Sequence, residues 1–231
     1  GAGPAFCAGY DLSMNRNVPF PMFEAEGTGS FQRHVVKGWF HIMDLAKPVI
    51  AQVHGFCLAG GSELAAACDL VYVANDAKIG YPPVRSMGLP DTQIFPWVMG
   101  MRQSMKIMLT GDNMSGLEAV ETGWANASFP AAELEDAVLD VAQRIAKIPS
   151  DLTAYNKRSV HRAMEAMGMR NHFRAHSDLQ ALSFETASSR LFMKNFAGKG
   201  SHRKAFSQRD SKFGDNRVAK EENKEEVNKI L

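Results

Sequence analysis

The stretch His54-Gly-Phe-Cys-Leu-Ala-Gly-Gly-Ser-Glu63-Leu-Ala-Ala-Ala-Cys-Asp69 decides the fold of this chain. It follows residues 49–53, a short run rich in β-branched side chains that is typical of a buried strand. Within it, the pair Gly60-Gly61 predicts a turn, and residues 62–68 predict a helix. Residues 70–74 predict a second strand. This order of strand, turn, helix and strand is typical of a mixed α/β fold.

The glycine pair at the start of the predicted helix is a candidate binding site for an anionic oxygen. Backbone N–H groups near Gly60 and Gly61 have no acceptor within the helix, and a helix N-terminus adds partial positive charge. Close packing of a helix on a strand demands glycine too, so both interpretations stand. Glu63 lies in the first turn, where burial would raise its pKa and the helix dipole would lower it.

The rest of the chain is mostly helical in pattern. Residues 31–45 predict a helix that is closed by Lys47-Pro48, after a loop over residues 13–30. Further helices are predicted over residues 115–122, 131–146, 151–167 and 172–190. Strands therefore come first and helices last.

Composition bounds the possible partners. The chain has 231 residues with 45% hydrophobic content, which is enough for one large core. Its 26 Lys and Arg residues against 25 Asp and Glu residues offer no reason to expect nucleic acid or a membrane as a partner. The longest apolar region, residues 49–74, is interrupted by His54, Glu63 and Asp69, so we do not expect it to span a membrane.

The cysteines indicate a reduced compartment. Cys7, Cys57 and Cys68 are odd in number and lack the paired spacing of a zinc site. We therefore expect a cytoplasmic protein without a metal site. Cys57 is expected to be a core residue, and His54 is expected to bond to backbone and to have no catalytic role.

Two further segments make the central stretch specific. They are Gly1-Ala-Gly-Pro-Ala-Phe-Cys-Ala-Gly-Tyr10-Asp11-Leu12 and Ala77-Lys-Ile-Gly-Tyr-Pro-Pro-Val-Arg-Ser-Met-Gly-Leu-Pro-Asp91. Together and in this order, the three segments resemble the crotonase (enoyl-CoA hydratase/isomerase) superfamily. The resemblance implies an α/β (α+β) fold, a crotonase-like ββα spiral with a C-terminal helical trimerisation region.

The resemblance also divides the chain. Residues 1–130 would form the spiral core, residues 131–214 the helical region for trimerisation and for covering CoA, and residues 215–231 a charged tail. Residues 1–6 are typical of the turn after a strand, so we expect the N-terminal part of the core to be missing from the sequence.

The family resemblance assigns candidate site residues. The backbone N–H groups of Tyr10 and Gly60 would form an oxyanion hole that grips the thioester carbonyl and stabilises the enolate. Residues that would line the substrate site are Ala8, Gly9, Asp11, Leu12, Gly61, Tyr81, Pro83 and Phe206.

The candidate acids and bases depart from the usual family pattern. Glu63 matches the first of the two glutamates that hold water in the hydratases, but Pro83 stands in the place of the second and cannot exchange a proton. Asp91, eight residues later, is at a position resembling that of a catalytic aspartate in dienoyl-CoA isomerases and in a dehalogenating branch. The alternative is that Asp91 caps the following helix.

The resemblance implies an acyl-CoA thioester as substrate, with coenzyme A as part of the substrate and no separate cofactor. The first choice of reaction is water addition to a 2-enoyl-CoA. Alternatives are an enoyl- or dienoyl-CoA isomerase, a dehalogenase or hydrolase of the same family, and a member that binds acyl-CoA without turnover. The family also implies a homotrimer or a dimer of trimers.

Overall fold

The computed structural model describes residues 1–10, 36–196 and 201–214. Asp11 and Leu12, which the resemblance places at the substrate site, lie outside the described residues. The loop predicted over residues 13–30 and the charged tail over residues 215–231 lie outside them as well.

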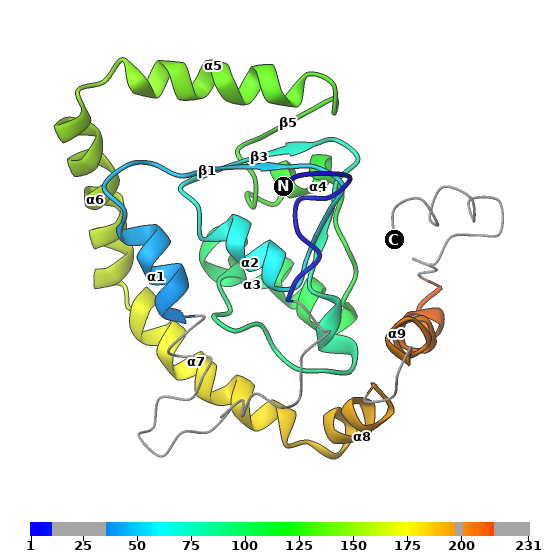
Figure 1. The fold of residues 1–231 in the computed structure, drawn as a ribbon. Helices are drawn as coiled ribbons and strands as arrows, with labels where there is room; N and C mark the ends of the chain where they lie inside the picture. The colour runs from blue at the N-terminus through cyan, green and yellow to red at the C-terminus, as the bar shows by residue number, and fades with distance from the viewer. Residues whose placement is uncertain (11–35, 197–200, 215–231) are drawn as a thin grey trace.

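Two parallel sheets form the centre of the fold (Figure 1). One has the order β1-β3-β5 and the other pairs β2 with β4; the bounds are β1 Ile50–Val53, β2 Phe56–Leu58, β3 Leu70–Ala74, β4 Lys78–Gly80 and β5 Ala127–Phe129. Ile50 is in register with Leu70, and Phe56 with Lys78. Successive strands alternate between the sheets, which is the ββα spiral predicted from the sequence.

The helices largely follow the sequence pattern. Their bounds are α1 Lys37–Asp44, α2 Gly60–Ala66, the 3₁₀ helix η2 Pro82–Arg85, α3 Phe95–Thr110, α4 Gly116–Glu121, α5 Leu134–Ala146, α6 Ser150–Ala166, α7 Met169–Phe184, α8 Ala187–Phe196 and α9 Ser201–Ser211. Helix α3 was not predicted; Gly100, at φ 74° and ψ 171°, breaks its periodicity. The single helix predicted over residues 172–190 is wrong. The Thr186 hydroxyl accepts a hydrogen bond from the Ser189 N–H at 3.3 Å and so begins α8 separately.

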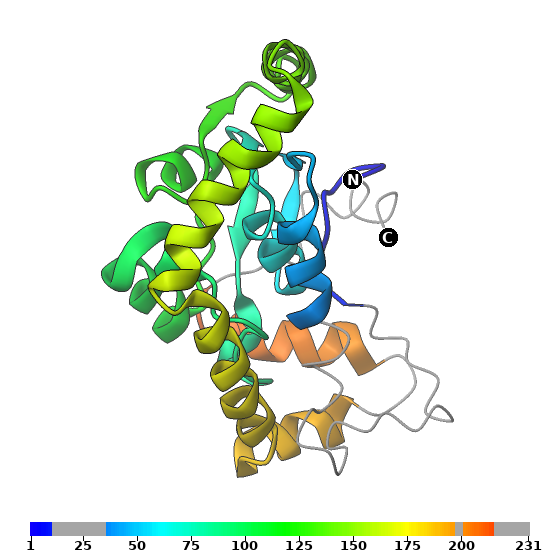
Figure 2. The same ribbon diagram turned by 90° about the vertical axis from the view of Figure 1, so that its left-hand side faces the viewer.

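The helices enclose the sheets from several sides. Helix α5 lies along the sheet formed by β1, β3 and β5, with α2 and α3 on the opposite side (Figure 1). Helices α6 and α7 follow one another down one flank of the molecule (Figure 2). The apolar core between these layers includes Val53, Val73, Ile79, Phe95 and Phe173, each with no exposed surface. Among the helices of the described segments, none has the length and apolar character needed to cross a membrane.

Candidate active site

Helix α2 delivers Glu63 into the interior, and the backbone before it adopts a conformation rare for its residue type. Ala59 immediately precedes the helix at φ 53°, a left-handed conformation that costs free energy for a residue with a side chain. Gly61 must be glycine, because a Cβ there would lie 2.3 Å from the carbonyl oxygen of Cys7. Close packing therefore accounts for Gly61. The tight turn places Glu63 in the first turn of α2, where its side chain is completely buried.

The two oxygens of the Glu63 carboxyl differ in their hydrogen bonds. Its Oε1 accepts hydrogen bonds from the Thr92 backbone N–H and from the Thr92 hydroxyl, each at 2.9 Å. Its Oε2 is buried and has no hydrogen-bond partner among the described residues. Thr92 thus anchors one oxygen, and the described part of the chain offers the other no well-aligned donor to stabilise a negative charge.

Asp91 is the second buried carboxyl of the site, and it is held at both oxygens. Its Oδ2 accepts a hydrogen bond from the Tyr10 hydroxyl, and its Oδ1 accepts one from the side-chain amide of Gln180 on α7. Helix α3 begins at Phe95, and no side chain caps its first turn. The alternative in which Asp91 caps this helix is therefore wrong.

Burial and mutual repulsion set the protonation of the two carboxyls. Burial raises the pKa of Glu63 well above its usual value, and the charge of Asp91 raises it further. Hydrogen bonds from Thr92 and from the Asp91 backbone N–H oppose both effects. Burial also raises the pKa of Asp91, to about 6, although hydrogen bonds from Tyr10 and Gln180 lower it. The repulsion between the two carboxyls favours keeping one proton on the pair when the pH rises toward neutral.

The candidate oxyanion hole lies beside this carboxyl pair. Gly9 approaches the start of α2 so closely that a Cβ on it would lie 3.8 Å from the Gly60 nitrogen. The next residue, Tyr10, places its aromatic ring over Gly60, where an added Cβ would lie 2.8 Å from the ring. The structure therefore brings together Tyr10, Gly60, Glu63 and Asp91, the four residues for which the sequence predicted catalytic roles.

The predicted substrate-lining residues divide into two groups. Ala8, Gly9 and Gly61 lie in the same two segments as the oxyanion positions, and Tyr81 is buried against Phe95 with ring centroids 6.2 Å apart. The remaining members lie farther along the chain, in η2 and α9.

The hydroxyl of Tyr81 donates to the Leu89 carbonyl at 3.1 Å, so it is already engaged with the backbone. Pro83 lies in η2, and its carbonyl accepts from the backbone N–H groups of residues 86–88. Phe206 on α9 contacts Phe192 and the guanidinium of Arg209, at centroid distances of 6.3 and 4.8 Å.

Sequence reasoning missed three residues around the carboxyl pair: Thr92, His176 and Gln180. Thr92 follows Asp91 directly, so its proximity could have been noted. His176 and Gln180 are one turn apart on α7, and no local pattern marks them. His176 lies 2.8 Å from the Pro90 carbonyl, and burial lowers its pKa to about 4, so it is neutral near pH 7.

Cys57 and His54 lie as the sequence predicted, in the core and in contact with the backbone, respectively. Cys57 is fully buried, burial raises the pKa of its thiol, and all three cysteines are free. His54 lies 2.8 Å from the Gly3 carbonyl, which is the predicted backbone bond. In residues 1–10, 36–196 and 201–214, no group of three or more His, Cys, Asp or Glu side chains is placed to hold a metal ion.

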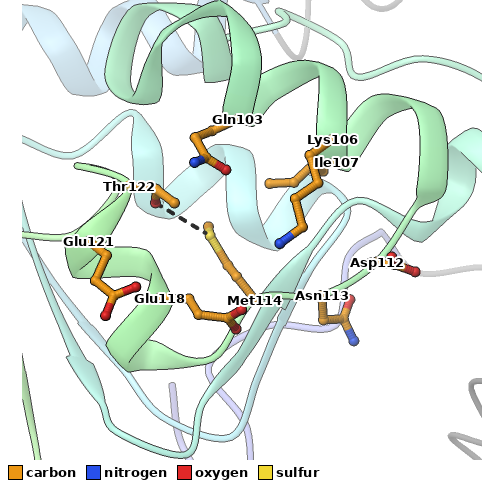
Figure 3. A pocket seen from close by; sticks show the side chains of 9 residues that line it. All are labelled: Gln103, Lys106, Ile107, Asp112, Asn113, Met114, Glu118, Glu121 and Thr122. Atoms are coloured by element: carbon orange, nitrogen blue, oxygen red, sulfur yellow. Dashed lines mark hydrogen bonds between the residues drawn. The ribbon is translucent and has the colours of Figure 1, made fainter.

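A separate cavity of about 120 Å³ lies between α3 and α4 (Figure 3). Its lining includes Lys106 and Gln103 from α3 and Glu118 from α4, and Lys106 extends into the space between the two helices. The carboxylate of Glu118 is already engaged with Ser115 in the capping box of α4. None of the carboxyl-pair residues lines this cavity.

Comparison with known proteins identifies the family. The sequence profile described as enoyl-CoA hydratase/isomerase matches residues 1–209. The mitochondrial enoyl-CoA hydratase of Pongo abelii is 30% identical over 168 residues, which cover 71% of this chain and 56% of that protein. The chain spans 56–58% of the length of three such relatives.

Solved structures agree with this assignment. The crystal structure of an enoyl-CoA hydratase from Mycobacterium smegmatis is similar with a TM-score of 0.81 and 28% identity, covering 92% of this chain and 76% of that one. An enoyl-CoA hydratase/isomerase from Xanthobacter autotrophicus Py2 is similar with a TM-score of 0.76 and 29% identity, covering 92% and 79%. The chain therefore belongs to the enoyl-CoA hydratase/isomerase family.

Proposed function

We propose that this chain processes acyl-CoA thioesters and that its reaction is the addition of water to a 2-enoyl-CoA. The observation that carries the proposal is the buried pair of Glu63 and Asp91 beside the backbone of Tyr10 and Gly60. Relatives that bear the name enoyl-CoA hydratase support this choice of reaction.

The proposed chemistry uses each part of the site once. The N–H groups of Tyr10 and Gly60 bind the thioester oxygen and stabilise the negative charge that develops on it. One carboxyl accepts a proton from water while the water oxygen bonds to the β-carbon. The other carboxyl gives a proton to the α-carbon. The sum is one water added, with Asp91 replacing the glutamate that is absent at Pro83.

Isomerisation of the double bond is the second candidate, because Pro83 removes the usual second glutamate and an isomerase can move one proton through Glu63 alone. The two reactions differ in the mass of the product. Hydration adds one water to the acyl group, whereas isomerisation leaves its mass unchanged.

The test is incubation of the chain with crotonyl-CoA and with a longer 2-enoyl-CoA. Loss of the conjugated thioester absorbance is followed, and products are identified by mass. We expect a gain of one water, a rate at least about 10²-fold lower in Glu63→Gln and in Asp91→Asn, and an unchanged rate in Glu121→Gln, whose side chain is exposed on α4.

Other outcomes would redirect the assignment. A product of unchanged mass would favour the isomerase, and full activity in Glu63→Gln would refute the site. Saturable binding of a non-reactive acyl-CoA analogue without turnover of any substrate would indicate a binding protein.

We also propose a homotrimer or a dimer of trimers. Helices α6 and α7 carry large apolar side chains that the single chain leaves in contact with solvent: Leu152, Tyr155, Val160, Leu179 and Leu182. Exposed apolar surface of this kind is typical of protein interfaces.

A further inference from the structure

The hydrogen bonds around the two carboxyls are distributed unequally. Asp91 accepts a donor at each oxygen, from Tyr10 near the N-terminus and from Gln180 on α7. Glu63 accepts two hydrogen bonds from Thr92, one from its hydroxyl and one from its backbone N–H, both at Oε1. The backbone N–H of Asp91 adds a weaker contribution to the same carboxyl. Both side chains have no exposed surface, so the difference does not arise from access to water.

This asymmetry bears on where the pair keeps its proton. A buried carboxylate oxygen without a donor is costly, and Oε2 of Glu63 has none among the described residues. A proton on Oε2 removes that cost and allows Glu63 to donate a hydrogen bond to Asp91. Asp91 is suited to the opposite state, because two donors point at its oxygens.

We propose that Tyr10 and Gln180 are positioning residues that keep Asp91 ionised and thereby leave the proton of the pair on Oε2 of Glu63. In the proposed hydration, on which this use of the pair rests, Asp91 is then the base that takes a proton from water. Glu63 is the acid that protonates the α-carbon. After turnover Asp91 holds a proton and Glu63 is ionised, and one proton transfer from Asp91 to Glu63 restores the resting state.

The other titratable groups facing the pair carry no charge near neutral pH. Burial raises the pKa of Tyr81 well above its usual value, and burial likewise raises that of Tyr10. His176, which faces Pro90 from α7, is kept neutral by burial, which lowers its pKa to about 4. The donors to Asp91 therefore remain the main means of dividing the proton between the two carboxyls.

The first test is the pH dependence of kcat/KM in Tyr10→Phe and Gln180→Met. Tyr10→Phe retains the ring over Gly60 and removes one donor to Asp91, and Gln180→Met retains the length of the side chain and removes the other. Each change should raise the pKa of Asp91, so the acidic limb should move to higher pH by about one unit. Activity should recover substantially at pH values above the new limb.

Two control variants remove side-chain hydroxyls that do not contact Asp91. Ser189→Ala removes the hydrogen bond from α8 to the Met87 carbonyl at 2.6 Å, and Tyr72→Phe changes a tyrosine that packs on Phe129. Both control variants should leave the acidic limb of the kcat/KM profile at the same pH. A loss of activity in Tyr10→Phe and Gln180→Met that is equal at every pH, with no movement of the limb, would refute the positioning role.

The second test does not need turnover, so it separates this proposal from the proposed function. Infrared difference spectra of the full chain at pH 7 should contain the carbonyl band of a buried carboxylic acid, and Glu63→Gln should lack it. The carboxylate band of Asp91 should titrate at higher pH in Tyr10→Phe than in the unchanged chain. A carboxylic acid band that survives in Glu63→Gln and disappears in Asp91→Asn would overturn the assignment, whatever reaction the chain performs.

Discussion

At the scale of the residue, Asp91 is costly to the fold. Its carboxyl is completely buried, and among the described residues Tyr10, Gln180 and Glu63 form side-chain hydrogen bonds with it. Burial of a charge that is incompletely paired destabilises a protein. Sites that hold such groups trade stability for activity.

The sign of the pKa shift predicts how this cost depends on pH. Burial raises the pKa of Asp91 from 3.8 to about 6. A carboxyl with a raised pKa contributes stability that is fully present below the unfolded value and is lost as pH rises through the folded value. The contribution of Asp91 should therefore disappear between pH 3.8 and about 6.

Asp91→Asn removes this titration, because asparagine is neutral throughout. We expect the difference in unfolding free energy between Asp91→Asn and the unchanged chain to shift by about 1–3 kcal/mol in favour of the variant from pH 4 to pH 7. Denaturant unfolding followed by circular dichroism at the two pH values measures it. A difference that is the same at both pH values would contradict the assigned burial of charge.

At the scale of the element, Asp69 ties helix α6 to the sheet. Its carboxylate lies 2.7 Å from Lys157 Nζ and 3.0 Å from His161 Nε2, both on α6, and it accepts from the Val49 N–H at 2.7 Å. Burial opposes the charge, but the hydrogen bonds from His161, Lys157 and Val49 outweigh it and lower the pKa of Asp69. Since α6 has no fully buried residue of its own, this polar contact is a main attachment of the helix.

Asp69→Asn should therefore loosen α6. The variant leaves Lys157 its hydrogen bonds to the carbonyl oxygens of Ile42 and Lys47 but removes its ionic partner. We therefore expect a loss of about 1–3 kcal/mol in unfolding free energy at pH 7. Amide hydrogen exchange should accelerate in α6 more than in β1 and β3.

The matched control is Arg162→Gln on the same helix. Arg162 pairs with Glu165 at the surface, and 70% of the Arg162 side chain is exposed. Arg162→Gln should therefore lower the unfolding free energy by less than about 0.5 kcal/mol. Equal losses in the two variants would show that Asp69 has no special role in holding α6.

At the scale of the whole molecule, helices α6 and α7 run down one flank (Figure 2). Both helices expose large apolar side chains. Tyr155 is 75% exposed and Leu182 is 64% exposed. Isolated apolar residues are common on surfaces, but several on adjoining helices favour contact with another chain.

We expect the purified chain to sediment as a trimer or a hexamer at micromolar concentration. Sedimentation velocity combined with light scattering gives the mass directly. The paired substitution Tyr155→Lys and Leu182→Lys should lower the mass by disrupting the exposed flank, while far-UV circular dichroism stays unchanged. A monomer at all accessible concentrations would refute the proposed assembly.

The sequence by itself determined the features that depend on neighbouring residues. Strand β3, the glycine turn before α2 and the place of Glu63 in its first turn all follow from spacings of a few residues, because hydrophobic periodicity and turn chemistry act locally. The segments around Tyr10 and Asp91 were identified by family resemblance, which is likewise judged from short stretches of neighbouring residues.

Only the tertiary structure decided how these residues work together. The Tyr10 hydroxyl reaches Asp91 across 81 positions of the chain, and the Gln180 amide reaches it across 89. No local pattern encodes such contacts, because they exist only when the spiral and α7 pack on one another. The same packing excludes water from Glu63 and Asp91, and it distinguishes a helix cap from a buried carboxyl that shares a proton.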